Sequence, residues 1–161
     1  MIIAAGLIFS LGGDIALIFP LAKALLIGMS FFALTHLIYG LGFTWFSGFS
    51  WQDVLSALAI IIFSAIIYVY LYPSLGKMKL AVAFYVLIIS FMVWRAVSVL
   101  FGTAFTPVQA YLIVSGAILF YLADALEAFY RFKSQILRLR AVYLSLYFSG
   151  QLLIALSTFY F

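Results

Sequence analysis

Six long apolar runs divide this chain of 161 residues, and they limit its possible folds more than any other feature. Cut at proline, glycine and charged residues, the runs cover about 2–19, 23–46, 54–72, 80–101, 108–130 and 141–160. Each has roughly 18–24 residues, enough for a helix to cross about 30 Å of hydrocarbon. The sequence therefore predicts an all-α fold, a polytopic transmembrane helical bundle of about six spans.

The composition leads to the same class. The chain is 69% hydrophobic and 7% charged, whereas soluble domains are about 45–50% apolar and about 25% charged. This is too much apolar surface for one soluble core, so we expect an integral membrane protein. No linker or low-complexity tract interrupts the chain, which predicts a single transmembrane domain over residues 1–161. The absence of cysteine excludes disulfides, cysteine–metal sites and thiol nucleophiles.

Breaks between the runs fall at Pro20, "SGFSWQD", "PSLGKMK", "GTAFTP" and "RFKSQILRLR". These connections are short, so we expect consecutive helices to be antiparallel neighbours. Tyrosine and tryptophan near the helix ends fit aromatic belts at the membrane interfaces. These residues are Trp45, Trp51, Tyr68, Tyr70, Tyr72 and Tyr160.

All basic residues except Arg95 lie in alternate turns. The first, third and fifth turns hold Lys23, Lys77, Lys79, Arg131, Lys133, Arg138 and Arg140, and the second and fourth hold none. By the positive-inside rule, turns one, three and five are cytoplasmic and both termini lie outside. The net charge of +4 then reflects orientation, and we expect no nucleic-acid partner. The alternative is a basic patch that binds a soluble partner.

Several ionisable residues lie inside the predicted spans, at a cost of roughly 2.5–3.5 kcal/mol each, which favours a functional role. They are Asp14, His36, Arg95, Asp124 and Glu127, with Tyr39, Tyr147 and Gln151 as polar neighbours. At about 1.5 Å per residue, Asp14, Asp124 and Tyr147 lie about 9 Å from the cytoplasmic helix ends. His36, Arg95 and Gln151 lie deeper, at roughly 15–23 Å.

Helical spacing places these residues on faces that also carry small residues. Gly6, Ser10, Gly13 and Asp14 share one face, and small residues of this kind line helix contacts in membranes. The other faces are Gly116, Phe120, Asp124 and Glu127; His36, Tyr39 and Gly40; and Tyr143, Tyr147, Gly150 and Gln151. We expect the four faces to converge on one interior pocket.

Each residue also has a structural interpretation. Asp14 and Asp124 are alternatively buried structural acids, hydrogen-bonded or paired with Arg95. Glu127 lies four residues before Arg131, a favourable spacing for an ion pair near the interface. His36 alternatively hydrogen-bonds Tyr39 or a carbonyl group.

The pattern of these residues limits the chemistry. One histidine and scattered acids make a weak ligand set, so no metal site is predicted. No Gly-rich phosphate loop and no G-x-S-x-G motif occur, which gives nucleotide chemistry and a serine hydrolase no support. Two carboxyl groups close together at low dielectric do not both ionise easily. Such a pair suits acid-catalysed hydrolysis through an oxocarbenium-like cation, and equally a proton-coupled transporter.

Five segments together resemble the YhhN/TMEM86 membrane protein family. They are "SLGGDIALIF", "GMSFFALTHLIYGLGF", "VAFYVLIISFMVWRA", "SGAILFYLADALEAFYRF" and "YLSLYFSGQLLIALS", in family order over most of the chain. The resemblance implies a lysoplasmalogenase, a helical membrane enzyme that hydrolyses the vinyl ether bond of lysoplasmalogens to a fatty aldehyde and a glycerophospho-amine. The expected partners are a lysophospholipid substrate and membrane lipids, and no cofactor is required.

The resemblance also implies roles for individual residues. The two motif aspartates of the family correspond to Asp14 and Asp124, its histidine and tyrosine to His36 and Tyr39, and its late glutamine to Gln151. We therefore expect Asp14 and Asp124 to be the catalytic acid and base or stabiliser. The residues expected to position substrate, water or the phosphate head group are His36, Tyr39, Arg95, Tyr147 and Gln151.

The chain departs from the family pattern in two ways. Members usually have about eight spans, so the chain is expected to lack N-terminal helices of the family. Ala123 stands before the second motif aspartate, where members usually carry serine. The other functions that the residues allow are a small proton-coupled transporter or lipid-binding membrane protein, and a structural membrane subunit.

Overall fold

Six α-helices with short 3₁₀ segments make up the computed structural model, which describes residues 1–19 and 23–160. The helices are α1 (Ile2–Ile18), α2 (Ala24–Ser47), α3 (Gln52–Leu71), α4 (Lys79–Ser98), α5 (Pro107–Phe132) and α6 (Leu137–Leu156). This confirms the predicted all-α bundle, with helix ends a few residues from the predicted ones. Pro20 and the side chain of Tyr160, assigned above to a turn and to an aromatic belt, lie outside the described part.

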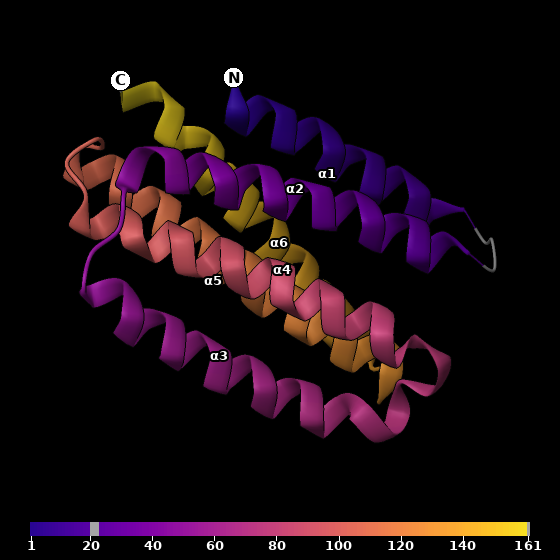
Figure 1. Ribbon diagram of the computed structural model, residues 1–161. Helices are drawn as coiled ribbons and strands as arrows, with labels where there is room; N and C mark the ends of the chain where they lie inside the picture. The colour runs from indigo at the N-terminus through magenta and orange to yellow at the C-terminus, as the bar shows by residue number, and fades with distance from the viewer. Residues whose placement is uncertain (20–22, 161) are drawn as a thin grey trace.

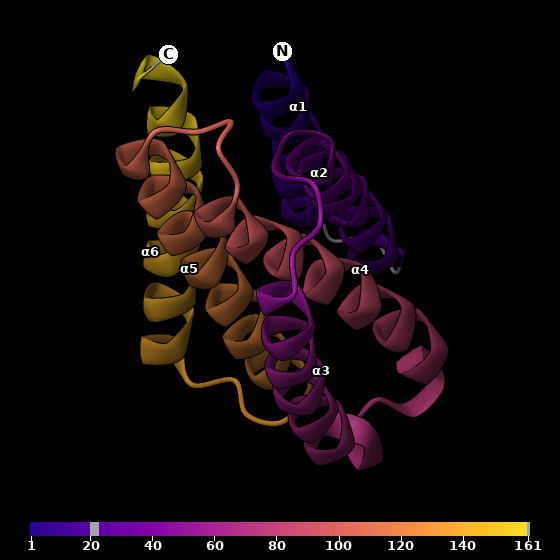
Figure 2. The ribbon, with the colours of Figure 1, turned by 60° about the vertical axis from the view of Figure 1, so that its left-hand side comes forward.

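The helices run up and down as a bundle, with both termini at one end (Figure 1). Five of them are long and apolar enough to cross a membrane, and α1, with 17 residues, is slightly shorter. In the bundle α1 packs on α2, α2 on α4, and α5 on α6, while α3 lies on the outer side of α4 (Figure 2). The chain is therefore a multi-pass membrane protein.

One prediction about packing is wrong: α2 and α3 are consecutive but are not packed neighbours. The connection of residues 48–51 carries the chain from α2 past the end of α4, so that α4 lies between them (Figures 1 and 2). Gly48 makes this path possible with φ 67°, a left-handed value that favours glycine. A short loop limits the distance between helix ends, but it does not decide which helix faces pack.

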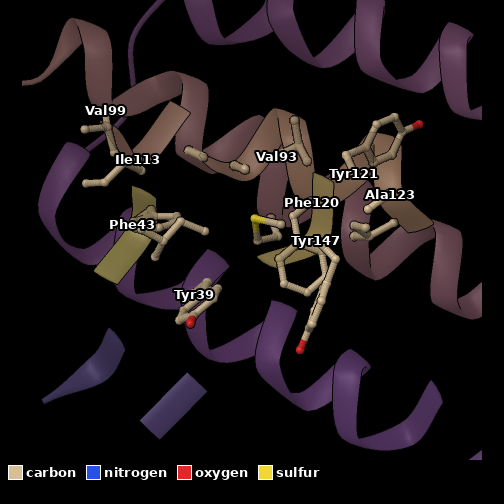
Figure 3. Close-up of a cluster of buried hydrophobic side chains, with 14 of the residues drawn as sticks. Tyr39, Phe43, Val93, Val99, Ile113, Phe120, Tyr121, Ala123 and Tyr147 are labelled. Carbon is tan, nitrogen blue, oxygen red and sulfur yellow. The ribbon is translucent and has the colours of Figure 1, made fainter. Parts of the chain in front are cut away.

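The buried apolar core lies where α2, α4, α5 and α6 meet. Phe120, from α5, and Tyr147, from α6, lie side by side in this core (Figure 3). The outer face of α3 is different, because its large apolar side chains are exposed. These side chains include Leu55, Leu58, Ile61, Ile62, Ile66 and Val69. Such a surface is suited to lipid.

Helices α5 and α6 approach each other to backbone contact at Gly116 and Gly150. A Cβ atom on Gly116 would lie 2.7 Å from the carbonyl oxygen of Gly150, and one on Gly150 would lie 2.8 Å from the carbonyl oxygen of Gly116. Only glycine allows this approach, as is typical of close helix pairs in membranes. The positions of Asp124 on α5 and Tyr147 on α6 are therefore set by a close backbone contact.

Candidate functional site

The first polar cluster is centred on Asp14 and joins α1, α2 and α6. The Tyr147 hydroxyl donates to Asp14 Oδ2 at 2.7 Å and lies 2.7 Å from Ser10 Oγ. Gln151 Nε2 donates to Ser10 Oγ at 2.7 Å, and the Tyr39 hydroxyl donates to Gln151 Oε1 at 3.2 Å. With Ser10 donating to Tyr147, every hydrogen bond in this chain of side chains is directed toward the carboxyl group of Asp14.

The second polar cluster is centred on Asp124 and joins α2, α4 and α5. The Tyr85 hydroxyl donates to Asp124 Oδ2 at 2.5 Å. His36 Nε2 lies 3.2 Å from the same oxygen and 3.1 Å from the Tyr85 hydroxyl. The tautomer with hydrogen on Nε2 is the one that lets His36 donate to the carboxylate. Within the described residues, the buried Nδ1 atom of His36 has no hydrogen-bond partner.

Helix α2 connects the two clusters. It supplies His36 to the Asp124 cluster and Tyr39, less than one turn further along, to the Asp14 cluster. Between the clusters, the ring of Phe120 packs edge-on against His36 at 4.7 Å and against Tyr147 at 5.2 Å, measured between ring centroids. The two aspartates are therefore held in neighbouring hydrogen-bond networks that aromatic packing keeps separate.

An apolar pocket adjoins the Asp124 cluster, between α2, α3, α4 and α5. It contains about 760 Å³ of space between atoms, a volume that includes space open to the outside. Most of its lining is apolar, and Tyr85, Asp124, Glu127 and Arg131 bring polar groups to its wall. Asp14 and Tyr147 are not among its lining residues, so Asp124 is the aspartate that this pocket presents to a ligand.

The polar faces were predicted to converge on one pocket, and in the structure their residues form two separate clusters. The structure brings Asp14 together with Tyr39, Tyr147 and Gln151, and it brings Asp124 together with His36. The predicted pair of Glu127 with Arg131 is confirmed, with 2.6 Å between Glu127 Oε1 and an Arg131 terminal nitrogen.

Arg95 lies in a third cluster, beside the loop between α2 and α3. Its guanidinium donates to Thr44 Oγ1 at 3.0 Å, to Ser47 Oγ at 2.8 Å and to the Gly48 carbonyl oxygen. Its other terminal nitrogen lies 3.6 Å from Asp53 Oδ2, and both side chains are almost fully buried. Arg95 therefore contacts neither aspartate cluster and does not line the pocket.

Sequence reasoning missed two members of the aspartate clusters: Tyr85, which contacts Asp124, and Ser10, which contacts Tyr147 and Gln151. Tyr85 was not singled out, although it lies six residues after Lys79 and so about 9 Å from the end of α4, the depth computed for the acids. Ser10 was placed on the Asp14 face but was given no role. Ala123, where the family usually carries serine, is buried at 2% exposure in the apolar core.

Comparisons with known proteins agree with these observations. The sequence profile of the YhhN family matches residues 1–158. Two relatives, each named lysoplasmalogenase TMEM86A, are 37% identical (Bos taurus) and 33% identical (Homo sapiens) over 160 residues. Each alignment covers 96% of this chain and 64% of the relative, so the chain spans just under two thirds of the length of the curated relatives that it matches. No solved structure matches the chain significantly.

Proposed function

The chain belongs to the YhhN family, and from this premise we propose that it is a membrane-embedded hydrolase that cleaves the vinyl ether bond of lysoplasmalogens. The products are a fatty aldehyde and a glycerophospho-amine. One observation carries the proposal: the Asp124 carboxyl group, held by Tyr85 and His36, forms part of the wall of an apolar pocket inside a helical bundle. The names of the two relatives support this choice of reaction.

The proposed reaction uses Asp124, in the wall of the pocket, together with Asp14, in the neighbouring network outside the pocket lining, and it consumes one water molecule. One aspartic acid transfers its proton to the vinyl carbon remote from the ether oxygen, and the carbon–carbon double bond supplies the electron pair for the new C–H bond. The positive charge is then shared by the ether oxygen and its neighbouring carbon. The other aspartate stabilises this cation and accepts a proton from the water that adds to the carbon. The hemiacetal then collapses: its carbon–oxygen bond to glycerol breaks as the second carboxyl group returns a proton to the glycerol oxygen, and the hemiacetal hydroxyl gives its proton to the first, which yields the aldehyde and the alcohol and restores both acids.

The hydrogen bonds hold the two carboxyl groups in a similar way. At each acid the known protein partners bind Oδ2, and no protein partner is found for Oδ1 within the described residues. Tyr147 and Tyr85 thereby fix the orientation of each carboxyl group and leave one oxygen for substrate or water. His36, Tyr39 and Gln151 act through these tyrosines and acids as positioning residues.

A panel of lysolipids tests the proposed reaction. Purified protein is incubated with vinyl ether, alkyl ether and ester lysolipids of the same chain length, and released aldehyde and fatty acid are measured. We expect aldehyde from the vinyl ether substrate alone. Fatty acid from the ester would instead indicate an esterase, and proton-driven uptake into liposomes without aldehyde would indicate a transporter.

The orientation in the membrane is part of the proposal, with turns one, three and five in the cytoplasm. Because the chain has no cysteine, single cysteines report it directly. In intact cells, we expect a membrane-impermeant maleimide to label Thr103→Cys in the exposed fourth turn. Lys77→Cys, in the exposed third turn, is expected to react only after permeabilisation. The reverse labelling pattern would invert the proposed topology.

A further inference from the structure

Arg131 lies at the polar end of the pocket that contains Asp124. The three residues Asp124, Glu127 and Arg131 follow each other on one face of α5, at spacings of three and four residues, and all three line the pocket. Within the described lining, Arg131 is the one side chain with a permanent positive charge. The polar side chains of the pocket therefore extend along one face of α5 toward the end of the helix, where Arg131 lies.

Glu127 holds the guanidinium of Arg131 in place without using all of its donors. Arg131 Nε donates to Glu127 Oε1 at 2.8 Å, and a terminal nitrogen lies 2.6 Å from the same oxygen. An arginine has five N–H donors in a planar fork, so this contact to one oxygen leaves several of them for a ligand. The Arg131 side chain is 30% exposed, which gives a ligand access to it.

The neighbouring cations are arranged differently. Lys79 lies over the ring of Tyr72 at 4.0 Å, and Lys133 lies over the ring of Tyr70 at 4.1 Å. Arg138 and Arg140 are exposed and do not line the pocket. General attraction of these residues to an anionic membrane surface therefore does not explain why Arg131 alone lines the pocket.

We propose that Arg131 binds the phosphate group of a lysophospholipid whose chain occupies the pocket, and that Glu127 is the positioning residue for its guanidinium. The inference rests on the proposed function for the choice of a lysolipid as ligand. Asp124 and Arg131 are seven residues apart, about 10 Å along the helix. A glycerol unit separates the phosphate from the vinyl ether carbon, a length that lets one molecule reach both residues. Arginine recognises phosphate through paired N–H donors.

Two ligands that differ only in the phosphoethanolamine head group test this assignment. Binding to the full chain in detergent is measured for an alkyl ether lysophosphatidylethanolamine, which has no vinyl bond to cleave, and for the alkylglycerol with the same chain. Arg131→Gln is expected to weaken binding of the phospholipid about tenfold to a hundredfold, the range for loss of a hydrogen bond to a charged group. Binding of the alkylglycerol is expected to remain unchanged, which also shows that the pocket is folded.

Further variants and one soluble ligand complete the experiment. Arg138→Gln removes the same charge from an exposed position outside the pocket and is expected to change neither affinity. Arg131→Lys retains the charge without the fork and is expected to recover part of the loss. Inorganic phosphate is expected not to displace the lysophospholipid, because it lacks the chain that fills the apolar pocket.

Three results would overturn the assignment: equal loss of both ligands in Arg131→Gln, loss of neither, or displacement of the lysophospholipid by inorganic phosphate at similar concentrations. The proposed hydrolysis can fail independently. If the lysophospholipid binds in the Arg131-dependent way and no vinyl ether is cleaved, the phosphate site stands and the hydrolase proposal does not.

Discussion

Asp124→Asn is expected to reduce the kcat for vinyl ether cleavage by about a hundredfold to ten-thousandfold, the usual contribution of a positioned acid or base. The amide has nearly the shape of the carboxyl group, but it neither donates a proton to carbon nor accepts one from water. Asp14→Asn is expected to cause a loss in the same range, since the mechanism needs two carboxyl groups. Aldehyde release measured at saturating substrate checks both variants.

The control for these variants is binding of the uncleavable alkyl ether lysolipid, which should remain close to that of the unchanged protein. Tyr85→Phe removes the hydroxyl that donates to Asp124 Oδ2 at 2.5 Å and is expected to give a smaller loss, because the acid remains. If both asparagine variants fold, bind the lysolipid and cleave the vinyl ether at the normal rate, the two aspartates are not catalytic.

Arg95→Leu is expected to lower the free energy of unfolding by about 3–5 kcal/mol, the cost of leaving one partner of a buried ion pair uncompensated. Asp53 is 1% exposed, and its carboxylate would lose its charged partner while it keeps the bond from the Ser50 backbone amide at 2.5 Å. The loop between α2 and α3 would also lose the donors that bind Thr44, Ser47 and Gly48. Thermal unfolding in detergent, followed by tryptophan fluorescence, measures the change.

Two further variants test whether the unpaired charge of Asp53 causes the loss of stability. Adding Asp53→Leu to Arg95→Leu is expected to restore part of the lost stability, because no buried charge remains. Arg140→Leu changes an exposed arginine and is expected to have an effect within about 0.5 kcal/mol. A normal unfolding temperature for Arg95→Leu combined with a raised KM would instead assign Arg95 to substrate binding.

The sequence predicted the helices well because each apolar run has the length that a bilayer imposes. It did not predict that α4 lies between α2 and α3. That arrangement depends on the contacts of Arg95 with both sides of the connecting loop, and a single charged residue in an apolar run has many possible partners. Helix order and loop length contain no information about that choice.

For the candidate site, helical spacing predicts the faces that carry the two clusters, but depth does not predict their contacts. The depth estimate places His36 deeper than Asp124, which it contacts, and beside Arg95, which contacts neither acid.

Tyr147 and Gln151 lie on one face of α6, one turn apart. Tyr147 donates to Asp14, and Gln151 donates to Ser10 in the same network. Tyr85 was missed because an uncharged tyrosine in an apolar run has little free-energy cost in a membrane, whereas a buried acid has a large one. Searching for hydrogen-bond donors at the depth of each acid would have found it.

Helix α3 contributes a wall to the pocket but no residue to either aspartate cluster. The acids and their partners lie on the other five helices, whose spacing includes the backbone contact of Gly116 with Gly150. Substitutions at the pocket-facing positions of α3, such as Ile67 and Leu71, can therefore alter which hydrocarbon chains fit while the reacting groups stay in place. Under the proposed function, substitutions can therefore change the selectivity for the hydrocarbon chain without changing the groups that react with the vinyl ether.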